Sequence, residues 1–392
     1  MQKLKKQQRE RSRTSLLRLS DDASLKHLEE YYLYNKSTDE LYEIDEKACD
    51  FLRSCDGSNV HIIPDEDFEF IDFCLEEGIV KELNSPAVKK NIAVHANPAA
   101  PSLRYLELLI TDKCNLSCRH CYIKQTGNTD LSLDAIKKTF SEFESLGGVR
   151  LMVSGGEPLL HKSFGEINDL VWQYDFRSIL ITNGTLINKF IVDNLNFNEV
   201  QISLDGLEKT HDYIRGEGSF VGALNAISLL LGRGIDVSVA TMILNHNQDD
   251  LEKLGRLLSV MGVKRWEVDV PCATSDDEIF MGYERAGKSF KHGFSSGLYN
   301  SADGYACGAH LMTVMNNGNV TKCSFFADDY VGSLDDGLSN CFGKLRKIKL
   351  TELECDCDYI EECRGGCRYR AMLGGGIKKK DIAKCGFYLD NK

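Results

Sequence analysis

The sequence predicts an α/β protein whose central part is a parallel sheet covered by helices. Between residues 104 and about 271, six apolar strand-like runs alternate with segments that carry apolar residues at helical spacing. Such alternation is typical of βα units, in which helices connect neighbouring parallel strands. A small segment with its own strands and helices precedes these units, and a cysteine-rich segment follows them, so we expect three domains.

Composition narrows the class of protein. The chain has 392 residues, of which 42% are hydrophobic and 27% charged, with a net charge of −12. This is the composition of a globular protein that is too long for one core. Because it contains no apolar run of 18 residues, we expect no transmembrane span and no membrane partner. Residues 1–13 are basic and lack the apolar core of a signal peptide. The acidic balance argues against nucleic acid as a partner, and we expect a cytoplasmic protein.

The predicted domain boundaries follow changes in composition. Residues 1–20 are expected to be a flexible basic arm. Residues 21–95 are expected to form a small domain of two aromatic-rich strands, two helices and a short final strand. A proline-containing linker leads into the βα units at 96–285, and residues 286–392 form the cysteine-rich domain.

The βα units supply the scaffold on which a site would be built. We predict strands at residues 105–111, 150–154, 178–182, 199–204, 236–243 and 265–270. Helices are expected near residues 136–146, 165–174, 186–195, 220–231 and 249–261. In barrels of βα units the chemistry lies at the C-terminal ends of the strands, so the residues that follow each strand are the candidates for a site.

Three cysteines follow the first strand in the pattern C-x3-C-x2-C: Cys114, Cys118 and Cys121. Thiolate is the soft ligand that iron–sulfur centres prefer, so three thiolates on one loop can hold three corners of a cubane cluster. With no fourth cysteine in the loop, one iron is left open to a ligand that is not protein. The alternatives are a zinc knuckle or three buried thiols, but zinc prefers four closed ligands.

This cysteine pattern after a strand resembles the signature of the radical S-adenosylmethionine (radical SAM) superfamily. The resemblance implies a partial (β/α)6 barrel in which SAM binds the open iron and is cleaved to methionine and a 5′-deoxyadenosyl radical. After the second strand, Gly155, Gly156 and Glu157 with the following proline match the family's GGEP motif. In the family this motif hydrogen-bonds the amino group of SAM.

The resemblance also assigns residues after the later strands to SAM. It places Asn183, Ser203 and Asp205 on the ribose and methionyl parts, Arg215 on the carboxylate, and His120 beside the adenine. A guanidinium suits the carboxylate because it can donate two parallel hydrogen bonds. Turn chemistry is the alternative for the first three residues, and a surface ion pair is the alternative for Arg215.

The C-terminal cysteines resemble the SPASM extension of the same superfamily, which carries two auxiliary [4Fe–4S] clusters. By this resemblance the first cluster is held by Cys307, Cys323 and Cys367. The second is held by Cys355, Cys357, Cys363 and Cys385, although the spacing between the first two is one residue shorter than usual. Cys272 and Cys341 are the candidates for a fourth ligand of the first cluster, which otherwise has an open iron. Zinc binding is the alternative for the whole region.

Together these resemblances imply a SPASM radical SAM enzyme that matures a ribosomally made peptide. Residues 21–95 resemble the winged-helix RiPP recognition element, which binds a leader peptide as an added strand. A scaffolding cap is the alternative, and a DNA-binding winged helix is disfavoured by the acidic residues of this segment. We expect three [4Fe–4S] clusters, SAM, and an external electron donor such as flavodoxin or ferredoxin. The product would be a thioether, carbon–carbon or ether crosslink.

Three other functions stay open from the sequence. Oxidation of a Ser or Cys to formylglycine is disfavoured, because that family carries an Asp where Ser324 stands. Epimerisation would need a thiol to return a hydrogen atom, for which Cys272 or Cys341 could serve. A non-enzymatic iron–sulfur electron carrier would need no SAM site, so the GGEP motif and Arg215 argue against it.

Overall fold

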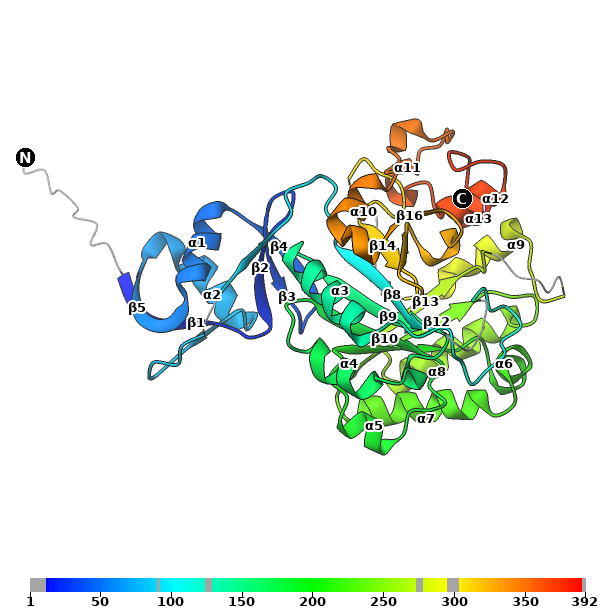
Figure 1. Cartoon of the computed structure of the whole chain (residues 1–392), viewed down its shortest axis with the longest axis horizontal. Helices are drawn as coiled ribbons and strands as arrows, with labels where there is room; N and C mark the ends of the chain where they lie inside the picture. Colours follow the sequence, from blue (N-terminus) through cyan, green and yellow to red (C-terminus); the bar gives the residue numbers. More distant parts are fainter. Residues whose placement is uncertain (1–11, 90–91, 124–128, 273–277, 295–302, 390–392) are drawn as a thin grey trace, which may run out of the picture. The chain divides into compact units, whose positions relative to one another are not determined.

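The computed structural model describes the chain except for residues 1–11, 90–91, 124–128, 273–277, 295–302 and 390–392 (Figure 1). The chain divides into two compact units, Met1–Ala100 and Pro101–Lys392. Each unit has its own buried core. None of the helices in the described part of the chain is long and apolar enough to cross a membrane.

The first unit contains two sheets and two α-helices. One sheet has the order β5-β1-β6, from β5 (Asp56–Pro64), β1 (Ser12–Leu19) and β6 (Val80–Glu82). The other has the order β4-β3-β2-β7, from β4 (Glu40–Ile44), β3 (Tyr31–Asn35), β2 (Ala23–His27) and β7 (Val94–Ala96), of which β7 joins in parallel. The helices are α1 (Glu46–Ser54) and α2 (Phe68–Glu76). Leu17, Leu25, Leu33, Leu52 and Ile71 are fully buried in the shared core.

The expected flexible arm at residues 1–20 is wrong for its second half. Residues 12–19 form β1, which pairs on one side with β5 and on the other with β6. The reason is burial: Leu17 and Leu19 are almost fully buried, and each such side chain contributes about 1.5–3 kcal/mol. Residues 1–11 lie outside the described part of the chain. The winged-helix-like character of residues 21–95 stays a prediction.

The second unit is built on one nine-stranded sheet with the order β13-β12-β11-β10-β9-β8-β14-β15-β16. Its six βα strands are parallel and lie in sequence order. They are β8 (Tyr105–Thr111), β9 (Arg150–Gly155), β10 (Arg177–Thr182), β11 (Glu199–Ser203), β12 (Asp236–Met242) and β13 (Arg265–Asp269). Because β8 pairs with β9 and β14 and not with β13, the barrel is partial, as predicted.

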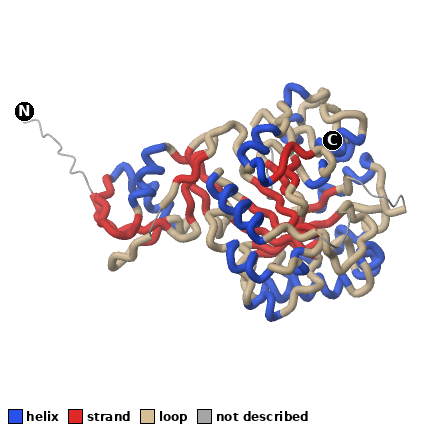
Figure 2. Tube along the Cα trace, in the orientation of Figure 1, coloured by secondary structure: helices blue, strands red, loops and turns tan. Residues whose placement is uncertain are grey.

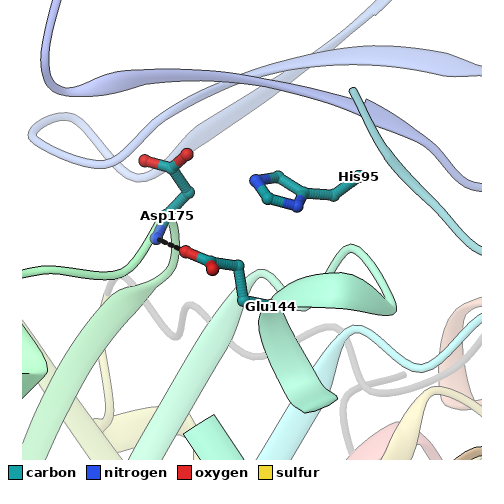
Figure 3. A group of neighbouring side chains, drawn as sticks. All are labelled: His95, Glu144 and Asp175. Carbon is teal, nitrogen blue, oxygen red and sulfur yellow. Dashed lines mark hydrogen bonds between the residues drawn. The ribbon is translucent and has the colours of Figure 1, made fainter. Parts of the chain in front are cut away.

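Helices lie on the outer side of this sheet (Figures 1 and 2). They are α3 (Leu133–Ser145), α4 (Phe164–Val171), α5 (Lys189–Asp193), α6 (Glu208–Arg215), α7 (Ser219–Gly232) and α8 (Leu251–Met261). The helix predicted at 186–195 is therefore shorter than expected. Ser132 caps α3 by accepting from the backbone N–H of Ala135. Glu144 lies in the last turn of α3 and accepts a hydrogen bond from the backbone N–H of Asp175 at 2.7 Å (Figure 3). This bond joins α3 to the segment that precedes β10.

Alternate residues of the parallel strands point to the helices and to the barrel interior. Leu106, Leu108 and Ile110 of β8 pack with the helices in the main core. At the N-terminal end of the strands, Glu199 accepts from Arg265 Nη1 at 2.8 Å and from Arg177 Nη2 at 3.2 Å. This buried ion-pair network joins β10, β11 and β13 at that end of the sheet.

The cysteine-rich C-terminal region is continuous with the barrel sheet. Strand β14 (Leu311–Val314) pairs in parallel with β8, and β15 (Asn319–Thr321) and β16 (Tyr330–Ser333) follow antiparallel. The remaining helices are α9 (Tyr283–Gly287), α10 (Leu338–Lys344), α11 (Ile360–Cys363), α12 (Arg368–Leu373) and α13 (Ile382–Leu389). The structure thus differs from a separate domain at 286–392, because β14 extends the same sheet and both parts share one compact unit.

Candidate active site

The C-x3-C-x2-C loop begins where β8 ends, and Asp130 holds its start. Thr111 Oγ1 donates to Asp130 Oδ1 at 2.7 Å. Lys113 Nζ donates to the other oxygen of the same carboxylate at 2.7 Å. These contacts lower the pKa of Asp130 against the opposing effect of burial. The loop therefore leaves the sheet in a defined direction.

The three thiols of this loop act on one another through their charges. Cys114 and Cys118 are half-buried and Cys121 is exposed. Burial raises the pKa of Cys114, and it raises the pKa of Cys118 to about 11; the charge of the Cys121 thiolate adds to both shifts. Ligation by iron would replace these thiol protons. Three soft ligands on one loop fit a cluster with three protein thiolates and one open iron.

The glycine turn at the end of β9 packs directly against the backbone of the cysteine loop. The N–H of Gly156 donates to Thr111 O at 2.8 Å, and the N–H of Glu157 donates to Lys113 O at 2.6 Å. A Cβ atom on Gly155 would lie 2.3 Å from Thr111 O, and one on Gly156 would lie 2.2 Å from Lys113 O. Only glycine permits this approach, so the turn determines where the cysteine loop sits.

The carboxylate of Glu157 is fully buried and bound within the protein. Its Oε1 accepts from Thr182 Oγ1 at 2.8 Å, and its Oε2 accepts from the N–H of Asn183 at 3.0 Å. Burial raises the pKa of this carboxyl, although the two hydrogen bonds act in the opposite direction. Both oxygens thus tie the glycine turn to the end of β10.

Asn183 connects the end of β10 to the cysteine loop. Its Nδ2 donates to Asn115 Oδ1 at 3.0 Å, and its Oδ1 accepts from the N–H of Thr185 at 2.9 Å. Asn115 Nδ2 in turn donates to Thr185 Oγ1 at 2.8 Å. Asn183 therefore shows the turn chemistry that the sequence left as an alternative, and it also fixes a residue beside Cys114.

A buried ion pair lies beside the cysteine loop. Arg215 Nε donates to Asp205 Oδ2 at 2.5 Å, and Asp205 Oδ1 accepts from the N–H of Met242 at 2.8 Å. Burial alone would raise the pKa of Asp205, but Arg215 and His120 lower it to about 2. The surface ion pair considered for Arg215 is wrong, since its side chain is only 12% exposed.

His120 completes this group from the cysteine loop. Its Nε2 lies 3.4 Å from Asp205 Oδ2 and 3.4 Å from Arg215 Nη2. Burial lowers the pKa of His120 to about 4, so the ring is neutral at neutral pH. The positive charge of Arg215 also acts on the thiol of Cys118. The ion pair thus faces the three-cysteine loop from the end of β11.

The structure brings the residues predicted for SAM to one edge, the C-terminal ends of β8 to β11. Ser203 is the last residue of β11 and is half-buried there. The sequence analysis missed Asn115 and Tyr122, which flank the cysteines of the loop. Tyr122 donates to Ser324 Oγ at 3.1 Å and stacks at a tilt on Phe325, with ring centroids 4.7 Å apart. Both could have been proposed from the sequence, because each is a polar or aromatic residue directly beside a cysteine of the motif.

Four cysteines gather in the first group of the C-terminal region: Cys272, Cys307, Cys323 and Cys367. Cys272 Sγ lies 3.8 Å from Cys367 Sγ. The hydrogen bond from Cys272 lowers the pKa of Cys367 to about 7. The charge of Cys367 adds to the effect of burial in raising the pKa of Cys307 and Cys323. Cys272 and Cys367 are thus in contact, and Cys307 and Cys323 lie near enough to Cys367 for its charge to act on them.

Two salt bridges hold the backbone of this group in place. Asp381 Oδ2 accepts from the N–H of Cys367 at 2.7 Å and from Arg370 Nη2 at 2.9 Å. Arg370 Nη1 donates to Asp269 Oδ1 at 2.7 Å. Arg370 thereby links α12 to the end of β13 and brings Cys367 toward Cys272, which follows that strand.

The second group consists of the four cysteines Cys355, Cys357, Cys363 and Cys385. They line one pocket together with Tyr359, Ile360, Gly365, Lys380 and Tyr388. Burial raises the pKa of Cys363 to about 11, and the charge of Cys385 adds to it. Cys355 lies within the group, so its shorter spacing from Cys357 does not remove it from the pocket.

Cys341 does not belong to either group. It lies on α10, is fully buried in the core of the barrel, and donates to the carbonyl oxygen of Ser333 at 3.4 Å. Of the two candidates for a fourth thiol, the structure places only Cys272 beside the first group.

Comparison with known families decides the identity of the barrel. Residues 108–258 match the model of the radical SAM superfamily. This segment carries the cysteine loop, the glycine turn and the Asp205–Arg215 pair described above. Residues 108–258 form a radical SAM domain. The chain is therefore a radical SAM enzyme, and the non-enzymatic electron carrier considered from the sequence is wrong.

Similar proteins match well beyond this segment. The antilisterial bacteriocin subtilosin biosynthesis protein AlbA of Bacillus subtilis is 25% identical over 344 residues, covering 79% of this chain and 77% of AlbA. The mycofactocin maturase MftC of Mycolicibacterium smegmatis is 27% identical over 307 residues, covering 68% of this chain and 78% of MftC. Streptococcus suis SuiB, solved with S-adenosylmethionine and with its precursor peptide SuiA, has the same fold, with a TM-score of 0.66 at 14% identity over 94% of this chain and 99% of SuiB.

The radical SAM domain implies SAM and one [4Fe–4S] cluster. The grouped thiols on the loop after β8 fit the three protein ligands of that cluster. When bound, cluster and SAM together supply a carbon-centred radical that can take a hydrogen atom from an unactivated carbon. The protein supplies the geometry in which this happens.

We predict that Gly156→Ala disrupts this radical SAM site. The added Cβ would meet Lys113 O at 2.2 Å, so the cysteine loop must move, at a cost of about 1–3 kcal/mol. We expect the reconstituted variant to lose cluster iron and most cleavage of SAM, measured by iron analysis and 5′-deoxyadenosine release.

The matched control is Gly165→Ala on α4, where an added Cβ meets nothing within 4 Å. We expect it to keep its iron and its SAM cleavage. Equal iron content in the Gly156 and Gly165 variants would contradict the role given to the glycine turn.

Proposed function

We propose that this radical SAM enzyme modifies a ribosomally made precursor peptide. The observation that carries the proposal is a set of eight further cysteines, in two groups of four, within the compact unit that also carries the radical SAM loop. The names of its relatives point the same way, since AlbA acts in subtilosin biosynthesis and MftC is a maturase. SuiB, which shares the fold, binds a precursor peptide.

The proposed reaction removes two hydrogens from the peptide and joins two of its atoms. One hydrogen leaves as an atom, and the second leaves as an electron and a proton. The new bond is a thioether, carbon–carbon or ether crosslink. The two groups of cysteines would hold auxiliary iron–sulfur clusters, which can accept an electron.

Each group of residues has a proposed role. Cys114, Cys118 and Cys121 hold the cluster that binds SAM. Cys272, Cys307, Cys323 and Cys367 hold the first auxiliary cluster, and Cys355, Cys357, Cys363 and Cys385 hold the second. Arg215, oriented by Asp205, binds the carboxylate of SAM, and the neutral ring of His120 lies by its adenine. Gly155, Gly156, Glu157, Asn183 and Ser203 shape the remaining wall of the SAM site.

Two alternatives lose support from the geometry. Epimerisation needs a thiol that is free to return a hydrogen atom, but Cys272 is hydrogen-bonded to Cys367 and Cys341 is buried in the core. Formylglycine formation was disfavoured because Ser324 replaces an Asp, and Ser324 here accepts from Tyr122. Crosslinking needs neither feature.

We further propose that the unit Met1–Ala100 captures the leader of the precursor peptide, within residues 21–95. Among its described strands, β4 and β5 stand at the edges of their sheets, and an extended peptide can add to such an edge through backbone hydrogen bonds. Acidic residues are frequent in this unit, so a leader with Lys or Arg would associate in a salt-sensitive way. Flavodoxin or ferredoxin is the proposed electron donor.

The function is tested by anaerobic reaction of the reconstituted enzyme with SAM, a reductant and a candidate precursor peptide encoded beside its gene. We expect a peptide lighter by two hydrogen atoms. The triple variant of Cys114, Cys118 and Cys121 to Ala should lose about a third of roughly twelve irons and all SAM cleavage. A wild-type enzyme that cleaves SAM but leaves every such peptide unchanged would contradict the proposal.

The fourth ligand of the first auxiliary cluster is tested by Cys272→Ala. We expect loss of about a third of the iron, because the remaining three thiols leave one iron exposed, and loss of crosslinked peptide. Cys341→Ala removes a thiol of similar burial outside the group and should keep all of its iron. Iron loss from the Cys341 variant alone would reverse the assignment.

The leader-binding role is tested by removing residues 1–100. We expect residues 101–392 to keep SAM cleavage, while affinity for the precursor falls at least about tenfold, or 1.4 kcal/mol. Isothermal titration at low and high salt measures both affinity and its salt dependence. Undiminished binding by the shortened chain would leave the first unit without a role in recognition.

A further inference from the structure

Glu107 is a carboxylate on the inner face of the barrel. It lies in the middle of β8, between Leu106 and Leu108, which point to the helices. In the sheet register it stands opposite Met152 of β9 and Thr313 of β14. It is half-buried, whereas its neighbours along β8 are buried, so Glu107 keeps some solvent exposure toward the barrel interior.

The contacts of Glu107 place it between two cysteine sites. It accepts from Thr313 Oγ1 at 3.0 Å, and Ser324 lies near enough to lower its pKa. Ser324 in turn accepts from Tyr122 at 3.1 Å. Tyr122 follows Cys121 of the radical SAM loop, and Ser324 follows Cys323 of the first auxiliary group. A molecule lying between these two sites would face Glu107.

Two other carboxylates of the barrel are each paired with a cation. Glu199 is paired with Arg177 and Arg265, and Asp205 is paired with Arg215. Within the part of the chain that the structure describes, no Lys or Arg forms a salt bridge with Glu107. Burial therefore raises the pKa of Glu107, against the effect of its hydrogen bonds. A half-buried carboxyl without a salt bridge, on the inner face of the barrel, is a candidate for proton transfer.

We propose that Glu107 is the catalytic base of the peptide reaction. This inference rests on the function proposed above. After the peptide has lost one hydrogen atom, formation of the crosslink breaks an S–H, O–H or C–H bond of the second reacting group. The carboxylate of Glu107 accepts that proton and becomes a carboxylic acid. An oxidised auxiliary cluster held by the cysteine groups would take up the remaining electron, so two hydrogens leave the peptide and the step balances.

The competing explanation is that Glu107 has only a structural role. Substitution by glutamine distinguishes this role from that of a base. The side-chain carbonyl of a glutamine at this position cannot take a proton, but it can still accept from Thr313. We therefore expect Glu107→Gln to fold, to hold its iron, and to release 5′-deoxyadenosine within about twofold of the wild-type rate. A structural role alone would leave crosslinking intact as well.

The decisive measurement is the number of 5′-deoxyadenosine molecules released for each crosslink formed. In Glu107→Gln we expect this ratio to rise at least about tenfold, or 1.4 kcal/mol. We also expect an organic radical to accumulate in electron paramagnetic resonance spectra of samples frozen during turnover. Glu107→Asp, which keeps a shorter carboxylate, should restore part of the crosslinking.

The control is Glu267→Gln on β13, another half-buried inner-face carboxylate whose pKa burial raises. It should keep the wild-type ratio. A Glu107→Gln enzyme with wild-type coupling and no added radical signal would overturn the inference and leave the peptide function standing. Should Glu107→Gln lose its iron, Glu107→Met, which also cannot take a proton, replaces it: an uncoupled Glu107→Met enzyme with full iron supports the inference, and a fully coupled one overturns it. A wild-type enzyme that modifies no peptide would overturn both proposals.

Discussion

The site depends on one contact, the close approach of the glycine turn after β9 to the backbone that follows β8. Gly155 and Gly156 lie so near the carbonyl oxygens of Thr111 and Lys113 that no side chain fits between them. This approach sets the start of the cysteine loop, and Glu157 continues the chain of contacts to Thr182 and Asn183 at the end of β10. Three neighbouring strand ends are thus locked to one another before any cofactor binds.

The electrostatics of the site follow from the same scaffold. Charges at the N-terminal end of the strands neutralise one another around Glu199, and at the C-terminal end Asp205 is neutralised by Arg215. Burial raises the pKa of Cys118, and Arg215 acts in the opposite direction, toward the thiolate form that iron requires; Arg370 acts in the same way on Cys367. In the described part of the chain, by contrast, no cation pairs with Glu107.

Much of the barrel could be predicted because its parallel strands are buried on both faces and read as apolar runs. The cysteine motifs were equally visible, since ligand spacing is local. The strand β1 was missed because its partners β5 and β6 lie about 40 to 65 residues away, and a short run with Arg13 and Arg18 gives no sign of them. The sequence could not decide whether Cys272 or Cys341 is the fourth thiol of the first group, because neither lies close to a cysteine of that group along the chain. Glu107 was not predicted, because a single polar residue in an apolar strand forms no motif that could be recognised by its spacing.

The parallel pairing of β14 with β8 has a consequence for synthesis of the chain. The two strands are joined by a hydrogen bond between residues 206 positions apart. At roughly 5–20 residues per second, about 10–40 seconds pass between their emergence from the ribosome. During that interval the edge of β8 is an unpaired strand, open to aggregation. Until the last quarter of the chain has been made, binding of iron by the loop after β8 therefore competes with misassembly. The C-terminal region thus completes the fold of the barrel sheet, in addition to its proposed role in holding clusters.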